Sequence, residues 1–250
     1  MLTPSFALSH SGPELKEESE REQEERITKL FGEIAEGYDQ ANDRISFGLH
    51  RLWKALLCRD ALRELPSGES VLDLCCGTGD VACYLARLCP DAEVIGLDLT
   101  EQMLEIARRR GAKEPGLHFV QGNAMDTAFP ENRFRVVTAA FGLRNTADPE
   151  RALREILRIL KPGGSVFILE SSIPENGLVR LGFGVYFSAL MPVLGGGVRH
   201  RDAYRWLNES TWAFPRKEEL SAKLREVGFS GVRYRRLLFG CAAIHTGKKP

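Results

Sequence analysis

VLDLCCGTGD, residues 71–80, carries the clearest structural signal in the chain. Its first four positions are mostly apolar and predict a short buried strand, Gly77 and Gly79 predict a tight turn, and apolar residues at helical spacing follow. A strand, a glycine turn and a helix in this order open a doubly wound α/β unit, in which ligands bind beyond the carboxyl ends of the strands. The glycines let a ligand approach the backbone without a Cβ in the way. Asp73, within the strand, can accept hydrogen bonds from a cationic amino-acid group or from the amides of the loop.

A second acid restricts the class of ligand. Residues 94–98 predict another buried strand that ends in Asp98, about 20 residues after Gly79, where an acid can accept hydrogen bonds from both hydroxyls of a ribose. The turn is not the G-x-G-x-x-G of dinucleotide sites, because Asp80 follows it and would repel a pyrophosphate at the start of the helix. The pattern therefore favours a nucleoside without phosphates, S-adenosylmethionine, over NAD. The glycine turn alone is also typical of an ordinary strand–helix junction.

The composition limits the class of protein and its compartment. The 250 residues suffice for one α/β domain with additions, and 34 basic residues balance 34 acidic ones, so we expect no nucleic-acid partner. The six cysteines contain no C-x-x-C pair, and we expect reduced thiols and no metal site. The first residues lack the pattern of a signal peptide, and no apolar run reaches the roughly 18 residues that span a bilayer. We therefore expect a cytoplasmic protein.

The apolar pattern predicts one folded domain in several parts. Residues 1–26 are expected to be a disordered or charged helical lead, and a single domain covers 27–250: a helical lid (27–66), a cofactor-binding core (67–172), a substrate cap (173–214) and a closing helix and hairpin (215–250). The fold class is α/β, a Rossmann-like, mostly parallel seven-stranded sheet with an antiparallel last strand. The Glu-rich run at 17–26 is interpreted as a solvated helix face.

The lid mixes aromatic and polar residues in a way that is unusual for a plain surface helix. Tyr38, Asn42 and His50 are the polar side chains that we expect to contact a ligand there. A lone histidine such as His50 is more often structural than catalytic. In the core, the loop after the strand at 118–120 carries Asn123 and Asp126, either of which can accept from an adenine amine, and Ala124, whose backbone amide can donate.

A second informative stretch follows the strand predicted at 136–141. Arg144 and Asn145 leave this strand at the functional edge of the sheet, where such a pair has no packing reason to exist. The alternative is structural, with an ion pair for Arg144 and a helix cap for Asn145. Residues 161–164, KPGG, then predict a helix stop and a turn before the strand at 165–170.

An apolar insert follows that strand. Residues 178–194 are apolar and aromatic, interrupted by Gly182, Gly184 and Pro192. A core helix is the simplest interpretation. An apolar segment that is interrupted by glycines at this place also suits a substrate with a long apolar tail. The same face could then touch a membrane surface transiently without crossing it.

These stretches together resemble the ubiquinone/menaquinone biosynthesis C-methyltransferases of the UbiE/MenG type. The resemblance covers about residues 27–247 and rests on FxxIAxxYD (31–39), NxxxSxGxHRxWK (42–54), VLDLCCGTGD (71–80), FGLRN (141–145), LKPGG (160–164), YxxLxxS (204–210), FP (214–215) and GF (228–229). The FGLRN and HRxWK blocks are far more specific than the glycine turn. The resemblance implies methyl transfer from S-adenosylmethionine to a ring carbon of a polyprenylated quinol, with demethylmenaquinol or 2-methoxy-6-polyprenyl-1,4-benzoquinol as the substrate.

The residues that we expect at the site fall into three groups. The catalytic residues are Arg144, Asn145 and Tyr38; the cofactor-binding residues are Asp73, Gly77, Thr78, Gly79, Asp98, Asn123, Ala124 and Ala140; the substrate contacts are His50, Tyr186, His200 and Tyr204. Many family members have a serine where this chain has Ala140, so only the backbone can serve the cofactor there. The stretch at 198–201 is more basic than the family pattern and could meet a lipid headgroup or shape the quinol pocket.

A mechanism follows from the chemistry that the resemblance implies. A quinol carbon becomes nucleophilic when the neighbouring hydroxyl loses its proton, and Arg144 is suited to stabilise the resulting oxyanion as a fixed cation. A water held by Arg144 and Asn145, or by Tyr38, could take the proton. Two alternatives stay open: a methyltransferase for another apolar or polycyclic metabolite, and a non-catalytic S-adenosylmethionine-binding subunit of a quinone-synthesis complex. A peripheral position at the inner face of the cell membrane and a homodimer are further expectations.

Overall fold

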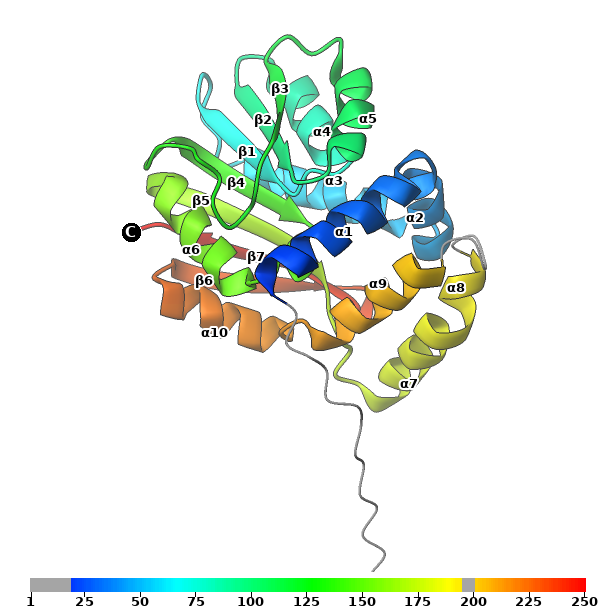
Figure 1. Ribbon diagram of the computed structural model, residues 1–250. Helices are drawn as coiled ribbons and strands as arrows, with labels where there is room; N and C mark the ends of the chain where they lie inside the picture. Colours follow the sequence, from blue (N-terminus) through cyan, green and yellow to red (C-terminus); the bar gives the residue numbers. More distant parts are fainter. Residues whose placement is uncertain (1–18, 195–200) are drawn as a thin grey trace, which may run out of the picture.

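The computed structural model describes residues 19–194 and 201–250. One seven-stranded sheet runs through its centre in the order β3-β2-β1-β4-β5-β7-β6 (Figure 1). Its strands are β1 (Ser70–Leu74), β2 (Glu93–Asp98), β3 (Leu117–Gln121), β4 (Phe134–Ala140), β5 (Leu160–Ser171), β6 (Ser230–Leu237) and β7 (Ala242–Lys248). Neighbours pair in parallel except β7, which is antiparallel to both β5 and β6. The expected fold class is confirmed, and its strand order reverses between β1 and β4, where such sheets bind ligands.

Helices cover both faces of the sheet. They are α1 (Glu20–Ile34), η1 (Ala35–Gly37), α2 (Tyr38–Ser46), α3 (Leu49–Leu62), α4 (Asp80–Leu88), α5 (Glu101–Gly111), η2 (Leu143–Asn145), α6 (Pro149–Ile159), α7 (Gly177–Val185), the π-helical η3 (Tyr186–Leu190), α8 (Met191–Leu194), α9 (Arg201–Ala213), α10 (Lys217–Val227) and η5 (Leu238–Gly240). One core cluster joins α3 and α4 to the sheet through residues such as Leu57 and Leu85, and a second joins α6 and α10 through Leu153 and Leu224. Burying each such leucine stabilises the fold by about 1.5–3 kcal/mol.

The amino-terminal helices and the apolar insert lie together at the functional edge of the sheet. Ser19 caps α1 in a capping box with Glu22, so the helix begins inside the charged lead. In Figure 1 α1 crosses in front of the sheet, and it contacts α5 and α9. The insert forms α7, η3 and α8, which contact α2 and α9. Within 19–194 and 201–250, we find no helix with the length and apolar character that crossing a bilayer requires.

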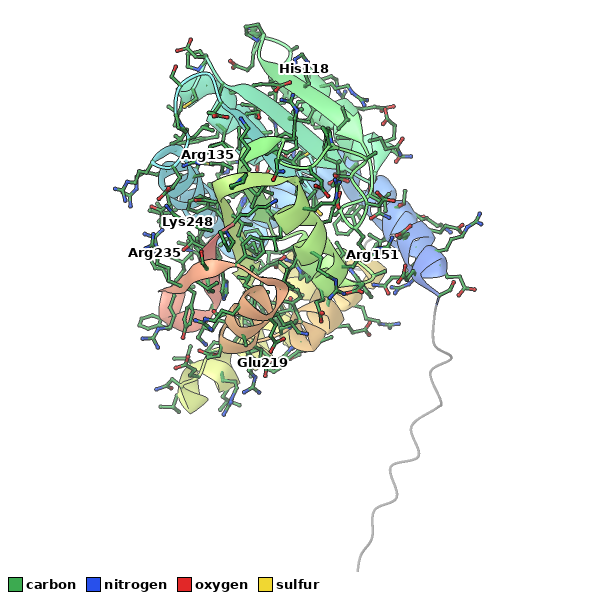
Figure 2. The ribbon with its side chains drawn as sticks, turned by 90° about the vertical axis from the view of Figure 1, so that its left-hand side faces the viewer. His118, Arg135, Arg151, Glu219, Arg235 and Lys248 are labelled. Carbon is green, nitrogen blue, oxygen red and sulfur yellow. The ribbon has the colours of Figure 1, made fainter. Side chains whose placement is uncertain are left out.

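Ion pairs tie the peripheral helices to the sheet. Arg235 on β6 donates to Asp60 on α3 at 2.6 Å, and Lys248 on β7 donates to Glu64 just after α3 at 2.8 Å. Figure 2 shows Arg235 and Lys248 on the same side of the molecule. Exposed pairs of this kind contribute only about 0–1 kcal/mol each to the free energy of unfolding. Their main effect is therefore to orient α3 against β6 and β7.

One local prediction is wrong. Residues 161–164 were expected to form a turn, but β5 begins at Leu160 and passes through them as an irregular start of the strand. Gly163 has a φ of +72°, and the register to β4 shifts between Phe134 and Val136. The Pro-Gly-Gly sequence therefore marks a bulged strand entry, because a positive-φ glycine is as typical of a bulge as of a turn. The closing helix and hairpin expected within 215–250 correspond to α10 and to β6 with β7.

Candidate functional site

A cavity lies at the carboxyl ends of the parallel strands, and we call it the cofactor cavity. Loops after β1, β2, β3 and β4 line it, together with α1. Its lining includes most of the residues expected at the cofactor, namely Gly77, Thr78, Asp98, Asn123, Ala124 and Ala140. The fold thus brings residues from four strand ends into one place.

Asp73 and Gly79 do not line this cavity and support its first loop instead. Gly79 has a φ of +81°, and a Cβ there would lie 2.9 Å from the ring of Phe119, so glycine is needed for this close approach. The buried Asp73 carboxylate accepts hydrogen bonds from the amide of Ala82 at 3.1 Å and the hydroxyl of Thr138 at 2.9 Å. Burial raises the pKa of Asp73 to about 7. Of the two kinds of partner considered for Asp73, the structure shows groups of the chain itself.

Asp98 stands at the tip of β2 with both carboxylate oxygens already oriented. Oδ2 accepts from the amide of Gly77 at 2.8 Å, and Oδ1 accepts from the amide of Thr100 at 2.9 Å. Burial raises the pKa of Asp98, and the backbone hydrogen bonds partly offset this effect. An ionised carboxylate offers about four acceptor sites, so each oxygen keeps capacity for a ribose hydroxyl.

Helix α1 contributes a carboxylate to the cofactor cavity that sequence reasoning missed. Glu24 accepts from the Asn123 side-chain amide at 2.6 Å, and the Asn123 oxygen accepts from the amide of Met125 at 2.9 Å. Glu24, Ile27 and Phe31 all line the cavity from one face of the helix. Their spacing of three and four residues was visible in the sequence. The solvated-face interpretation of residues 17–26 is therefore wrong at Glu24.

A charge network connects the lid to the first loop of the cofactor cavity. Asp39 accepts from the Thr78 hydroxyl at 2.8 Å, Arg110 on α5 pairs with both Asp39 and Asp80, and Lys54 on α3 donates to Asp80 at 2.9 Å. Burial raises the pKa of Asp80, but Lys54 and Arg110 outweigh it and lower the net value. Asp80 is thus paired with two cations. The repulsion of phosphate inferred from Asp80 alone is correspondingly weaker than the sequence indicated.

A second cavity of about 520 Å³ adjoins the first, and we call it the substrate cavity. Helices α2, α3 and α7, with η3 and η5, provide most of its wall, which is largely apolar. The expected site residues that line it are Tyr38, Asn42, His50, Ala140, Arg144 and Tyr186. Four residues line both cavities: Tyr38, Lys54, Ala140 and Phe141. These four residues therefore form a boundary between the two cavities.

Arg144 and Asn145 lie on different sides of this boundary. Arg144 faces the substrate cavity and pairs with Glu170 at 2.6 Å; the two side chains are 6% and 2% exposed. The Arg144 Nε is buried, and no described residue is its hydrogen-bond partner. Asn145 lines the cofactor cavity and accepts from the indole of Trp206 at 3.0 Å. Asp148, not Asn145, caps α6, so the structural alternative holds for the ion pair of Arg144 but not for a cap at Asn145.

The remaining expected substrate contacts have mixed outcomes. Tyr186 lines the substrate cavity and donates its hydroxyl to the carbonyl of Ile45, and burial raises the pKa of Tyr186 to about 12. His50 lines the same cavity. His200 lies outside the described residues, and Tyr204 belongs to α9 with its side chain outside the described part.

The chain matches proteins of known class over most of its length. Residues 19–249 match the model of the ubiE/COQ5 methyltransferase family. A demethylmenaquinone methyltransferase of Staphylococcus aureus (strain JH9) is 39% identical over 227 residues, which cover 90% of this chain and 93% of the relative.

Solved structures agree on the fold. A SAM-dependent methyltransferase from Thermotoga maritima matches with a TM-score of 0.61 and 22% identity, covering 89% of this chain and 99% of that one. Phosphoethanolamine N-methyltransferase 2 of Haemonchus contortus, solved with S-adenosyl-L-methionine, matches with a TM-score of 0.56 and 17% identity, covering 77% of this chain and 52% of that one. The fold, the paired cavities and the match over nearly the whole chain lead to one conclusion: this chain belongs to the ubiE/COQ5 methyltransferase family and is an S-adenosylmethionine-dependent C-methyltransferase.

Proposed function

We propose that this enzyme methylates a ring carbon of a polyprenylated quinol, with demethylmenaquinol as its substrate and menaquinol as its product. The observation that carries the proposal is the wall shared by the two cavities, because it places a large apolar chamber directly beside the cofactor cavity. The family and the name of the Staphylococcus aureus relative support the choice of ring. A benzoquinol with a polyprenyl chain is the second candidate, since the apolar wall suits either ring.

The residues of the cofactor cavity fit S-adenosylmethionine, which supplies an electrophilic methyl group when bound. Asp98 would hold the ribose hydroxyls, since both of its oxygens keep acceptor capacity beside their amide partners. Asn123 and Ala124 would lie at the adenine. Lys54 is the one basic side chain on the described part of this cavity wall, and it is suited to the cofactor carboxylate.

Arg144 would stabilise the quinol oxyanion from the substrate cavity. Its buried partner Glu170 fixes the guanidinium in one place, so little reorganisation is needed when negative charge develops on the substrate. The Nε, which has no partner in the described part of the chain, would donate to the substrate oxygen. The guanidinium also lies 5.7 Å from the ring centre of Phe141, one of the residues that line both cavities.

The mouth of the substrate cavity suits a polyprenyl tail that extends toward a membrane surface. Phe47, Leu238 and Phe239 line the cavity and are nevertheless 72%, 45% and 80% exposed. All three have a positive φ, and non-glycine residues in such conformations cost about 1–3 kcal/mol each, which is typical of functional positions. Leu178 and Leu181 are also exposed on α7, a helix whose Val179 and Phe183 line the same cavity. Exposed apolar surface at a cavity mouth favours a lipid or membrane partner.

We expect substitution of the two exposed phenylalanines to weaken binding to vesicles. The double variant Phe47→Ser and Phe239→Ser removes two side chains that would each bury apolar surface worth about 2 kcal/mol in lipid, so partitioning into vesicles should fall by roughly a thousandfold. Sedimentation with phosphatidylglycerol vesicles measures it. Leu88→Ser, at the end of α4 and 53% exposed, is the matched control and should bind as the unaltered protein does. Equal binding of the double variant and the control would contradict a membrane role for the mouth.

Labelled methyl transfer tests the proposed function directly. The protein is incubated with methyl-labelled S-adenosylmethionine and demethylmenaquinol in vesicles, and mass spectrometry of the extracted quinone locates the label. Label on the naphthoquinol ring supports the proposal. Label found only in another apolar metabolite of a lipid extract indicates a different substrate. Cofactor binding without any label transfer indicates a non-catalytic subunit.

A further inference from the structure

A histidine–aspartate pair lies in the wall of the substrate cavity. His50 Nε2 is 2.9 Å from Asp43 Oδ1, and Arg51 binds the same carboxylate, with its Nε 2.6 Å from Oδ1. His50 lies on α3 and Asp43 lies on α2, so the pair links the two lid helices. His50 is 5% exposed and lines the cavity, whereas Asp43 does not.

The partners of the two nitrogens define the tautomer of His50. Arg51 and His50 lower the pKa of Asp43 to about 2, so this carboxylate is ionised and only accepts hydrogen bonds. His50 Nε2 therefore carries the hydrogen, and Nδ1 of the neutral ring carries the lone pair. Nδ1 is buried and has no hydrogen-bond partner among the residues that the structure describes. A buried acceptor without a partner is costly, and a substrate hydroxyl in the cavity that His50 lines would satisfy it.

The other titratable side chains on the described wall of the substrate cavity are poor proton acceptors at neutral pH. Arg144 carries only hydrogen-bond donors, and the phenol of Tyr38 could take up a proton only after losing its own. Burial lowers the pKa of Lys54, but Asp80 outweighs it and raises the net value, so Lys54 stays protonated. Burial raises the pKa of Tyr186 and that of Cys241, so both stay protonated as well. No aspartate or glutamate lines this cavity among residues 19–194 and 201–250.

We propose that His50, oriented by Asp43, is the general base that accepts the proton of the quinol hydroxyl. This assignment rests on the proposed function, and it deepens it by replacing the water-mediated route with a side chain of the protein. An oriented histidine with a free ring nitrogen is the usual arrangement for such a step.

The proton balance of the step is simple. The O–H bond of the quinol breaks, an N–H bond forms at His50 Nδ1, and the electron pair stays on oxygen and is delocalised into the ring. The ring carbon becomes nucleophilic in this way. After methyl transfer the carbon releases its own proton to water, and the imidazolium of His50 returns its proton to the oxygen. One proton therefore leaves for each methyl group transferred.

The charges around His50 predict the pH dependence of the reaction. Burial lowers the pKa of His50, Lys54 on the same helix lowers it further, and Asp43 on α2 and Asp80 on α4 act in the opposite direction. The net value lies below the ordinary 6.5, so the base is free at neutral pH. We expect kcat to fall as the pH drops through this lowered pKa, because His50 becomes protonated and can no longer accept the quinol proton.

The variant His50→Gln tests the assignment. We expect kcat at neutral pH to fall about a hundredfold, at the low end of the range for acid–base catalysis, and the acidic limb of the kcat profile to disappear. The dissociation constant for S-adenosylhomocysteine, measured by calorimetry, should stay within about twofold, since His50 does not line the cofactor cavity. Imidazole should restore part of the activity of His50→Ala. Asp43→Asn, on a partly exposed residue, should lower kcat about tenfold because the tautomer is no longer fixed.

Two other histidines provide controls. His245 is also buried with an unpartnered Nδ1, but it lines neither cavity, so His245→Gln is expected to lower the melting temperature and keep the acidic limb. His118 is exposed on β3 at the opposite end of the sheet order from β6 (Figure 2), and His118→Gln should change neither property.

The outcomes separate this proposal from the proposed function. If the unaltered protein methylates the quinol and both His50→Gln and Asp43→Asn retain its kcat and acidic limb, the His50 assignment is overturned and a bound water is the base. If His50→Gln does not fold, a normal profile for Asp43→Asn overturns it equally. If the unaltered protein transfers no label to any quinol, the proposed function itself fails.

Discussion

Arg144→Lys is expected to lower kcat between roughly a hundredfold and a thousandfold, the cost of losing one donor to an oxyanion in an enzyme site. Lysine keeps the positive charge beside Glu170, which is 2% exposed, so the buried carboxylate still has a counter-ion. It lacks the planar guanidinium whose Nε is free of other partners. The loss should therefore appear in the chemical step. Single-turnover kinetics with a quinol substrate measure it.

Arg144→Lys is preferred over removal of the side chain. An alanine would leave Glu170 buried and unpaired, which costs about 3–5 kcal/mol and would mix misfolding with lost catalysis. Arg135→Lys is the matched control, because Arg135 lies near the start of β4, whereas Arg144 follows the end of that strand, and Arg135 lines neither cavity. We expect normal kcat for Arg135→Lys and unchanged cofactor affinity for both variants. A normal kcat for Arg144→Lys would remove Arg144 from the mechanism.

Asp98→Ala is expected to weaken S-adenosylmethionine binding about a thousandfold. Two hydrogen bonds from ribose hydroxyls to an ionised acceptor are worth about 2 kcal/mol each, and both would be lost. The Gly77 and Thr100 amides would lose their acceptor as well, which loosens the first loop of the cofactor cavity. Calorimetric titration with S-adenosylhomocysteine measures the change without any need for turnover.

Asp91→Ala is the control for this variant. Asp91 precedes β2 and is exposed at the other end of the strand from Asp98, so it changes the net charge equally without touching the cavity. Its affinity should match that of the unaltered protein. Affinity of Asp98→Ala within a few-fold of this control would mean that the ribose is held elsewhere.

The sheet and its strand ends could be predicted because they depend on local patterns. Apolar runs that end in Asp98 or lead into Arg144 are visible in the sequence, and parallel strands bring their carboxyl ends to one edge whatever the details of packing. The turn expected at 161–164 failed for the opposite reason. Its glycines permit both a turn and a bulged strand, and only the pairing with β4 distinguishes them.

The contacts between distant segments could not be derived in the same way. Glu24 accepts a hydrogen bond from Asn123, which lies 99 residues further along the chain. A glutamate in a charged run gives no indication of so distant a partner. Lys54 belongs to the HRxWK motif, yet its position in the walls of both cavities depends on how α3 packs against α4. The contact of Asp43 with His50 likewise forms only because α2 and α3 fold against each other.

The network of Asp39, Thr78, Arg110, Asp80 and Lys54 has a consequence for the timing of the catalytic cycle. It fastens α2 and α3 to the loop that begins α4, and two residues of this lid, Tyr38 and Lys54, form part of both chambers. We therefore expect any movement of these helices to open both chambers together. The spent nucleoside and the methylated ring would then leave from the same open state.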